Sequence, residues 1–151
     1  SEDTLEIRGP SADATTSTGK LLLSTALTDI NDGDVIGRID FKAVSEASGT
    51  DAILAGASIW AEADATFSSS VNSTDLVFAT GDSEVATEKF RIDSLGNATF
   101  VDGAIDVNIA SHDGTNGLKL GGTLVTATAA NLNATRTTAT TGKAIAMAIV
   151  F

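Results

Sequence analysis

Residues 53–65 carry an apolar side chain at every second position. Seven consecutive matches to a period of two predict one long β-strand, because successive side chains of a strand point to opposite faces. Most of these apolar side chains are Ala, so we expect another element or another chain to pack very close to this face. The positions in this run that we expect to pack between chains are Ile53, Ala55, Ala57, Ile59 and Ala61.

Residues 35–43 predict a second strand with one apolar and one charged face. The apolar positions are Val35, Gly37, Ile39, Phe41 and Ala43. The opposite positions, Arg38, Asp40 and Lys42, alternate in sign. This alternation is typical of a solvated face or of an ionic seam between chains.

Residues 75–100 predict a strand, a polar connection, a second strand, a tight turn at residues 95–97 and a third strand. Two apolar pairs are expected on strand faces: Leu76 and Phe78 share one face, and Phe90 and Ile92 share another. The polar residues expected in turn and seam roles are Arg91, Asp93 and Asn97. Nothing in this unit has the pattern of a reactive site.

The rest of the chain predicts short elements between turns rich in Gly, Asn and Asp. Short strands are expected at residues 4–8, 105–109 and 118–120, and residues 21–23 fit either a strand or a short helix. One helix of at most two turns is expected over residues 126–133, capped by Thr126 or Thr128.

The chain is therefore expected to be all-β, with short antiparallel strands and hairpins that form a sandwich or prism-like unit. We expect an N-terminal strand and loop segment at residues 1–33, which could serve for attachment. The main β module is expected at residues 34–110. A C-terminal β segment with the short helix and an apolar final strand is expected at residues 111–151.

The material for a core is limited. Aromatic residues make up 5% of the chain, with one Trp and no Tyr, and much of the 42% hydrophobic content is Ala. A core shared between copies would compensate, and the alternative is a thin monomeric sandwich. The C-terminal strand, with Ile145, Met147, Ile149 and Phe151, is too apolar for a free edge, so we expect it to be buried within or between chains.

Charge and composition exclude several classes of function. The net charge of −11 would repel nucleic acid and anionic membranes, and the absence of Cys excludes disulfides and thiolate chemistry. The acidic start predicts no secretory signal, and no apolar run approaches the roughly 20 residues needed to cross a bilayer. We expect no nucleic-acid partner and no membrane insertion.

The candidate chemical groups are few. Residues 111–113, Ser-His-Asp, match a catalytic triad in composition, but sequence neighbours cannot face one another as triad members do. Residues 29–34 depart from a calcium loop, because Gly33 occupies the fifth position and no Glu stands at the twelfth. We predict no catalytic residue, no metal and no cofactor. Trp60 and His112 are the candidate contacts for a receptor.

Four segments have a recognisable sequence pattern: residues 33–41, the strand through Trp60, residues 75–80 and, most specifically, residues 88–97. They resemble the module found in bacteriophage tail-fibre and related virion fibre proteins. The last segment commonly runs Glu-Arg-Met-Arg-Ile-Asp-Ser-x-Gly-Asn in that family, and Lys89 and Phe90 replace the Arg and Met here. Residues 120–133 and 141–151 are similar to segments of marine-phage fibre proteins, so the resemblance covers residues 34–151.

The resemblance implies a homotrimeric, intertwined β-structured shaft or knob without enzymatic activity. Its expected partners are copies of itself and other virion proteins, and its expected location is the virion after synthesis in the bacterial cytoplasm. The alternative is a module at a fibre tip that binds a host glycan or protein receptor. A depolymerising enzyme like a tailspike is a third hypothesis, with few aromatic platforms for sugars to support it.

Overall fold

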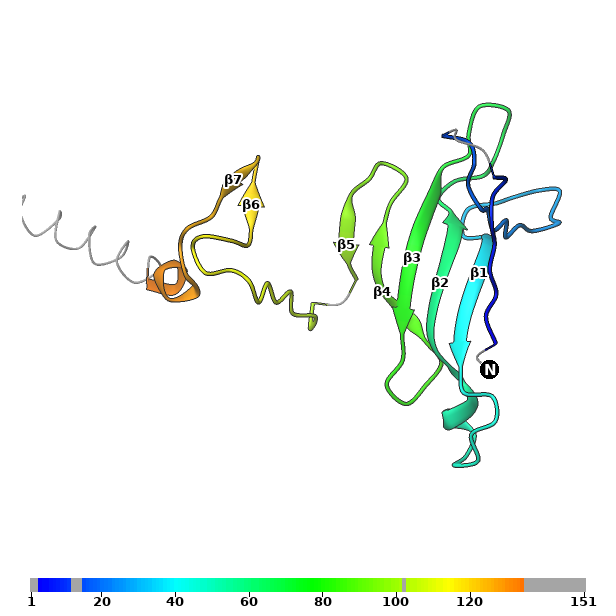
Figure 1. Ribbon diagram of the computed structural model, residues 1–151, viewed down its shortest axis with the longest axis horizontal. Helices are drawn as coiled ribbons and strands as arrows, with labels where there is room; N and C mark the ends of the chain where they lie inside the picture. Colours follow the sequence, from blue (N-terminus) through cyan, green and yellow to red (C-terminus); the bar gives the residue numbers. More distant parts are fainter. Residues whose placement is uncertain (1–2, 12–14, 102, 135–151) are drawn as a thin grey trace, which may run out of the picture. The chain divides into compact units, whose positions relative to one another are not determined.

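The computed structural model describes residues 3–11, 15–101 and 103–134. The chain divides into two compact units, Ser1–Ile105 and Asp106–Phe151. Both are built from antiparallel strand pairs (Figure 1). The expected all-β class is confirmed.

Unit 1 contains a five-stranded antiparallel sheet in which each strand pairs with the next along the chain. Its strands are β1 (Val35–Lys42), β2 (Ala55–Ala63), β3 (Thr74–Thr80), β4 (Thr87–Ile92) and β5 (Ala98–Phe100). A single 3₁₀ turn, η1 (Asp51–Ile53), precedes β2. The strands predicted from alternation at residues 35–43, 53–65 and 75–100 are therefore confirmed, and Ile53 lies outside its predicted strand.

Two other predicted strands are wrong. Residues 4–8 and 105–109 alternate in sequence but have no regular secondary structure. A strand needs a neighbour to satisfy its backbone groups, and alternation alone does not supply one. Residues 21–23 form neither a strand nor a helix.

The pairing of the sheet shifts at three positions. The partners of β2 move from Phe41↔Ala57 to Lys42↔Ala55, which leaves Gly56 as an extra residue in β2. Equivalent shifts leave one extra residue between Val35 and Gly37 in β1 and one between Glu88 and Phe90 in β4. Each such bulge interrupts the two-residue period, so the expected seven-position face of residues 53–65 is not continuous.

The buried core of unit 1 is small. Trp60, Val77, Ala79 and Ala86 form its apolar cluster, and Val77 is completely buried. Backbone bonds from Gly81 to Gly56 and from Ala86 to Ala55 hold the β3–β4 connection against the start of β2. A second layer is needed for a sandwich, and no second sheet packs on this one within the described part of unit 1.

Unit 2 has a short hairpin and a helical segment. β6 (Lys119–Leu120) and β7 (Thr123–Leu124) pair across Gly121 and Gly122, both of which adopt the positive φ that this tight turn requires. Residues 129–134 are helical. Thr128 Oγ1 accepts the N–H of Asn131 at 3.2 Å, so Thr128, one of the two predicted caps, is the N-cap.

Candidate assembly face

One face of the five-stranded sheet is almost entirely apolar, and we call it the apolar face. The strand register places twelve residues on it: Gly37, Ile39 and Phe41 of β1, Ala57, Ile59 and Ala61 of β2, Leu76 and Phe78 of β3, Phe90 and Ile92 of β4, and Ala98 and Phe100 of β5. None of these twelve carries a charge or a side-chain hydrogen-bonding group. The register also places Thr74 and Thr80 of β3 and Thr87 of β4 on this face, at the ends of their strands. The two apolar pairs expected on separate faces, Leu76 with Phe78 and Phe90 with Ile92, lie on the same face.

The centre of the apolar face is a row of cross-strand partners that includes every strand. Ile39 pairs with Ile59, Ile59 with Phe78, Phe78 with Phe90, and Phe90 with Phe100. The ring centroids of Phe78 and Phe90 are 5.6 Å apart and those of Phe90 and Phe100 are 4.9 Å apart, both tilted. Such contacts stabilise the register of the sheet in addition to burying apolar area.

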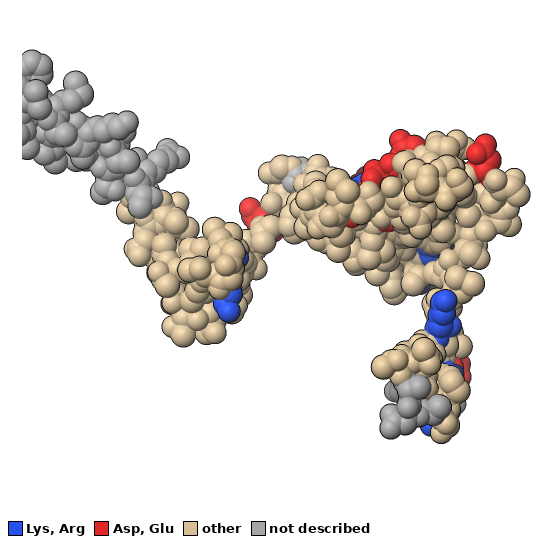
Figure 2. Space-filling view, turned by 90° about the horizontal axis from the view of Figure 1, so that it is seen from above, with Lys and Arg blue, Asp and Glu red and all other residues tan. Residues whose placement is uncertain are grey.

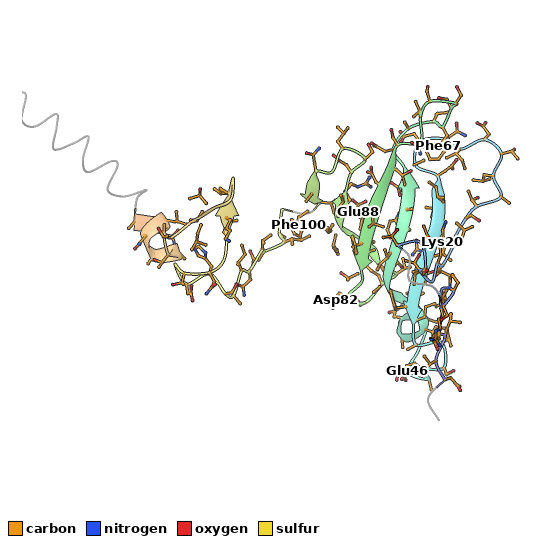
Figure 3. The ribbon with its side chains drawn as sticks, turned by 45° about the horizontal axis from the view of Figure 1, so that its top comes forward. Lys20, Glu46, Phe67, Asp82, Glu88 and Phe100 are labelled. Atoms are coloured by element: carbon orange, nitrogen blue, oxygen red, sulfur yellow. The ribbon has the colours of Figure 1, made fainter. Side chains whose placement is uncertain are left out.

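The apolar face is nevertheless open. Phe41 is 54% exposed, Phe100 48% and Leu76 41%, and Ile39 and Ile92 are nearly as accessible. Figure 3 shows Phe100 on β5 at the edge of the sheet. A contiguous apolar surface of this kind on a protein is typical of an interaction site.

The Leu21–Leu23 segment covers only part of this face. A Cβ built on Gly37 would lie 2.9 Å from the Cβ of Leu23, so the segment packs against β1 where a glycine leaves room for it. Between the segment and the sheet lies an open apolar cavity of about 330 Å³. Its walls include Ile39, Ile59, Ala61 and Leu76.

The opposite face, which we call the polar face, carries the buried side chains of Trp60, Val77 and Ala79. Its two arginines, Arg38 and Arg91, are paired with carboxylates of the same chain. Arg91 contacts three carboxylates: Glu62 at 3.1 Å, Glu88 at 2.6 Å and Asp75, which is 2% exposed. The second oxygen of Asp75 accepts the backbone N–H of Ser94 at 2.9 Å. The bonds to Glu88 raise the pKa of Arg91, and Arg91 in turn holds the pKa of Glu88 below its usual value. The network ties β2, β3 and β4 together.

A second group on the polar face lies over β1 and β2. Arg38 donates to Asp40 at 2.6 Å and to Ser58 at 2.8 Å, and Ser58 donates to Asp40. The hydrogen bonds from Ser58 and Arg38 lower the pKa of Asp40. In Figure 2 the acidic side chains gather in patches and leave broad areas of unit 1 without charge.

The two candidate receptor contacts have partners within the chain. Trp60 is 9% exposed, and its Nε1 donates to Glu62 at 2.9 Å. In unit 2, His112 Nε2 lies 2.9 Å from the carbonyl oxygen of Ala127, and Nδ1 lies 3.3 Å from the backbone nitrogen of Leu118. Since the Leu118 N–H must donate, Nδ1 accepts and Nε2 donates, which defines a neutral tautomer. His112 thus joins two loops of unit 2.

The residues predicted to pack between chains fall into three groups. Ala57, Ile59 and Ala61 lie on the apolar face. Ile53 is in η1, and Ala55 is buried beyond the Gly56 bulge. Ile145, Met147, Ile149 and Phe151 are outside the described residues.

Sequence reasoning left the phenylalanines of the apolar face out of the packing set. Phe41, Phe78, Phe90 and Phe100 are the largest side chains on it, and their alternation within each strand was the available signal. Alternation could not predict which strands pair. That pairing places Leu76 with Phe78 and Phe90 with Ile92 on one surface.

The described residues contain no group of three or more His, Asp or Glu side chains that could hold a metal ion. The loop at residues 29–34 is a turn in which Asp34 Oδ2 accepts the N–H of Asn31 at 2.7 Å and Gly33 has a φ of 84°. In the described part of the chain, no helix has the length and apolar character needed to cross a membrane.

Comparison with models of protein families and with curated proteins found no match for this chain. The geometry of the apolar face is therefore the structural observation from which a function can be argued.

Proposed function

We propose that this chain is a non-enzymatic structural subunit of a bacteriophage virion, a fibre or decoration protein of the tail or head that assembles as a homotrimer. The observation that carries the proposal is the open apolar face, with Phe41, Leu76 and Phe100 each more than 40% exposed. Burial of apolar surface stabilises an assembly by roughly 25 cal/mol per Å². The buried apolar cluster among the described residues has only four members, so burial of the apolar face would add substantially to stability.

The polar face supports the same proposal. Its Arg91 and Arg38 side chains are bonded to carboxylates of the same chain, so they need no ionic partner from another copy. An uncharged face also spares neighbouring copies the repulsion that a net charge of −11 would otherwise cause. The trimeric state and the virion assignment rest on the resemblance of residues 33–41 and 88–97 to fibre proteins.

The alternative of a receptor-binding module at a fibre tip has less support. Trp60 and His112, its two candidate contacts, already bond to Glu62 and to backbone groups of unit 2.

Size-exclusion chromatography with light scattering tests the assembly. We expect a mass about three times 15.2 kDa, and a wild-type chain that stays at 15.2 kDa at high concentration would contradict the proposal. Phe41→Asp, which places a charge on the apolar face, should shift the mass to that of one chain with unchanged circular dichroism. Thr99→Asp is the matched control, because Thr99 is opposite Arg91 on the polar face and should leave the mass unchanged.

The virion assignment needs a separate test. Antibodies against the chain, applied to purified phage particles and viewed by electron microscopy, should label fibres or the surface of the head or tail. If mass spectrometry detects none of this protein in purified particles, the virion assignment is wrong. The assembly result would still stand.

A further inference from the structure

The cavity on the apolar face has the dimensions of a site for protruding apolar side chains. Its lining includes the small residues Gly37 and Ala61. The larger side chains of Ile39, Ile59 and Leu76 also line it. An apolar cavity of about 150 Å³ is large enough for a benzene ring. The volume of about 330 Å³ therefore suits two large apolar side chains.

The shape of the apolar face limits what can cover the cavity. The Leu21–Leu23 segment stands over β1 at Gly37, so the surface is stepped there rather than flat. A second sheet laid face to face would meet this segment first and would be held away from Ile39 and Ile59. A single extended segment can lie beside it and reach the cavity.

The sequence of this chain offers one segment with matching chemistry. Residues 144–151, Ala-Ile-Ala-Met-Ala-Ile-Val-Phe, contain no charged or polar side chain. Side chains two apart in an extended segment point to the same side, so Ile145, Met147, Ile149 and Phe151 would all face one surface. The segment ends 17 residues after residue 134, which gives it a reach of up to about 55 Å from the last described residue.

We propose that residues 144–151 of one copy bind across the apolar face of a neighbouring copy and place two of their large side chains in the cavity beside Leu21–Leu23. This inference rests on the proposed assembly and names what holds it together. The apolar face is the binding surface, and its small residues Gly37 and Ala61 leave room for the cavity. The terminal segment of the neighbouring copy provides the side chains that fill it.

The absence of native Cys makes cross-linking a clean test, since the only thiols are those introduced. One chain would carry Ile39→Cys and a second, co-expressed chain would carry Phe151→Cys, with diamide as the oxidant. Disulfides form only where Cα atoms come within about 7 Å, so we expect about tenfold more cross-linked pair than in the control. The control replaces Ile39→Cys by Thr99→Cys, on the opposite face.

A second pair guards against a poorly folded variant. Leu76→Cys, also in the cavity lining, and Ile149→Cys, on the same side of the terminal segment, should give the same result. Circular dichroism of each assembly establishes that the chains are folded before oxidation.

Three results would overturn the inference. The first is no cross-link from either pair above the Thr99→Cys control. The second is a cross-link confined within one chain when Ile39→Cys and Phe151→Cys are combined, because the segment would then cover its own copy. The third is efficient pairing of Ile39→Cys chains with each other, because a second apolar face would then be the occupant. A trimer by light scattering with any of these results would leave the proposed function standing and remove only the inference.

Discussion

The guanidinium carbon of Arg38 lies 4.8 Å from the centroid of the Trp60 ring. The cation stacks on the aromatic face while its nitrogens bond to Asp40 and Ser58, so the ring is covered by a group that is itself fixed. Trp60 in turn packs with Val77 in the small core. Arg38 therefore covers the Trp60 ring on the polar face. The fluorescence of Trp60 can be used to follow the unfolding of unit 1.

Arg91→Met should destabilise unit 1 strongly. The substitution leaves Asp75, which is 2% exposed, without its cation beside Glu62 and Glu88. Removing one partner of a buried pair costs about 3–5 kcal/mol, and the partial exposure of Arg91 places this case near the lower value. Urea unfolding followed by Trp60 fluorescence measures the loss. The double variant Arg91→Met with Asp75→Asn should recover part of the stability, and purely additive losses would show that the two residues are not coupled.

Gly37→Ala should displace the Leu21–Leu23 segment. The new Cβ would lie 2.9 Å from Leu23 Cβ and 3.1 Å from the Leu23 carbonyl oxygen, closer than ordinary contact. We expect a loss of about 1–3 kcal/mol, as for other overpacked sites. Leu23→Gly removes the Cβ from this contact, so the double variant should lose less than the sum of the two single variants. Gly56→Ala is the control, since its Cβ would meet no atom within 4 Å.

His112→Ala should loosen unit 2 and leave unit 1 unchanged. It removes the acceptor of the Leu118 N–H and the donor to the Ala127 carbonyl, with an expected cost of about 1–2 kcal/mol. Amide hydrogen exchange by NMR should show faster exchange at Leu118 and no change at Val77. Lys119→Ala, an exposed neighbour in β6, is the control, and equal exchange in both variants would argue against a structural role for the ring.

Acid should destabilise the turn after β4. The side chain and backbone N–H groups of Asn97, with that of Leu95, donate to Asp93 and lower its pKa. The pKa of this carboxyl is then lower in the folded than in the unfolded chain, where it is about 4. Its contribution to stability is present above that value and is lost as the pH falls through the folded pKa.

The measurement compares urea midpoints at about pH 5 and pH 3, where this loss takes place. The wild-type midpoint should fall more than that of Asp93→Asn, whose amide oxygen still accepts but does not titrate over this range. Equal falls would show that Asp93 contributes nothing to the pH dependence.

Alternation in the sequence predicted the strands of the sheet because each strand has one apolar face. It failed at residues 4–8 and 105–109, where no neighbouring strand completes the hydrogen bonding. It also could not locate the extra residue at Gly56, since a bulge depends on what the partner strand does. The cap at Thr128 was predictable because a helix N-cap is a local interaction.

The assembly face was only partly predictable. Ala57, Ile59 and Ala61 were identified from one strand, but the row from Ile39 to Phe100 requires the register of five strands. The Arg91 network was equally hidden, because Glu62, Asp75 and Glu88 come from three different strands. In both cases the missing information was long-range pairing.

The order of the sheet also has a mechanical consequence. An antiparallel sheet with five strands in sequence reverses direction four times, so β1 and β5 run the same way. The chain therefore enters at Val35 and leaves at Phe100 from opposite ends of the sheet. Tension along the chain would pull β1 lengthwise past β2 and load its hydrogen bonds together, rather than opening them one after another.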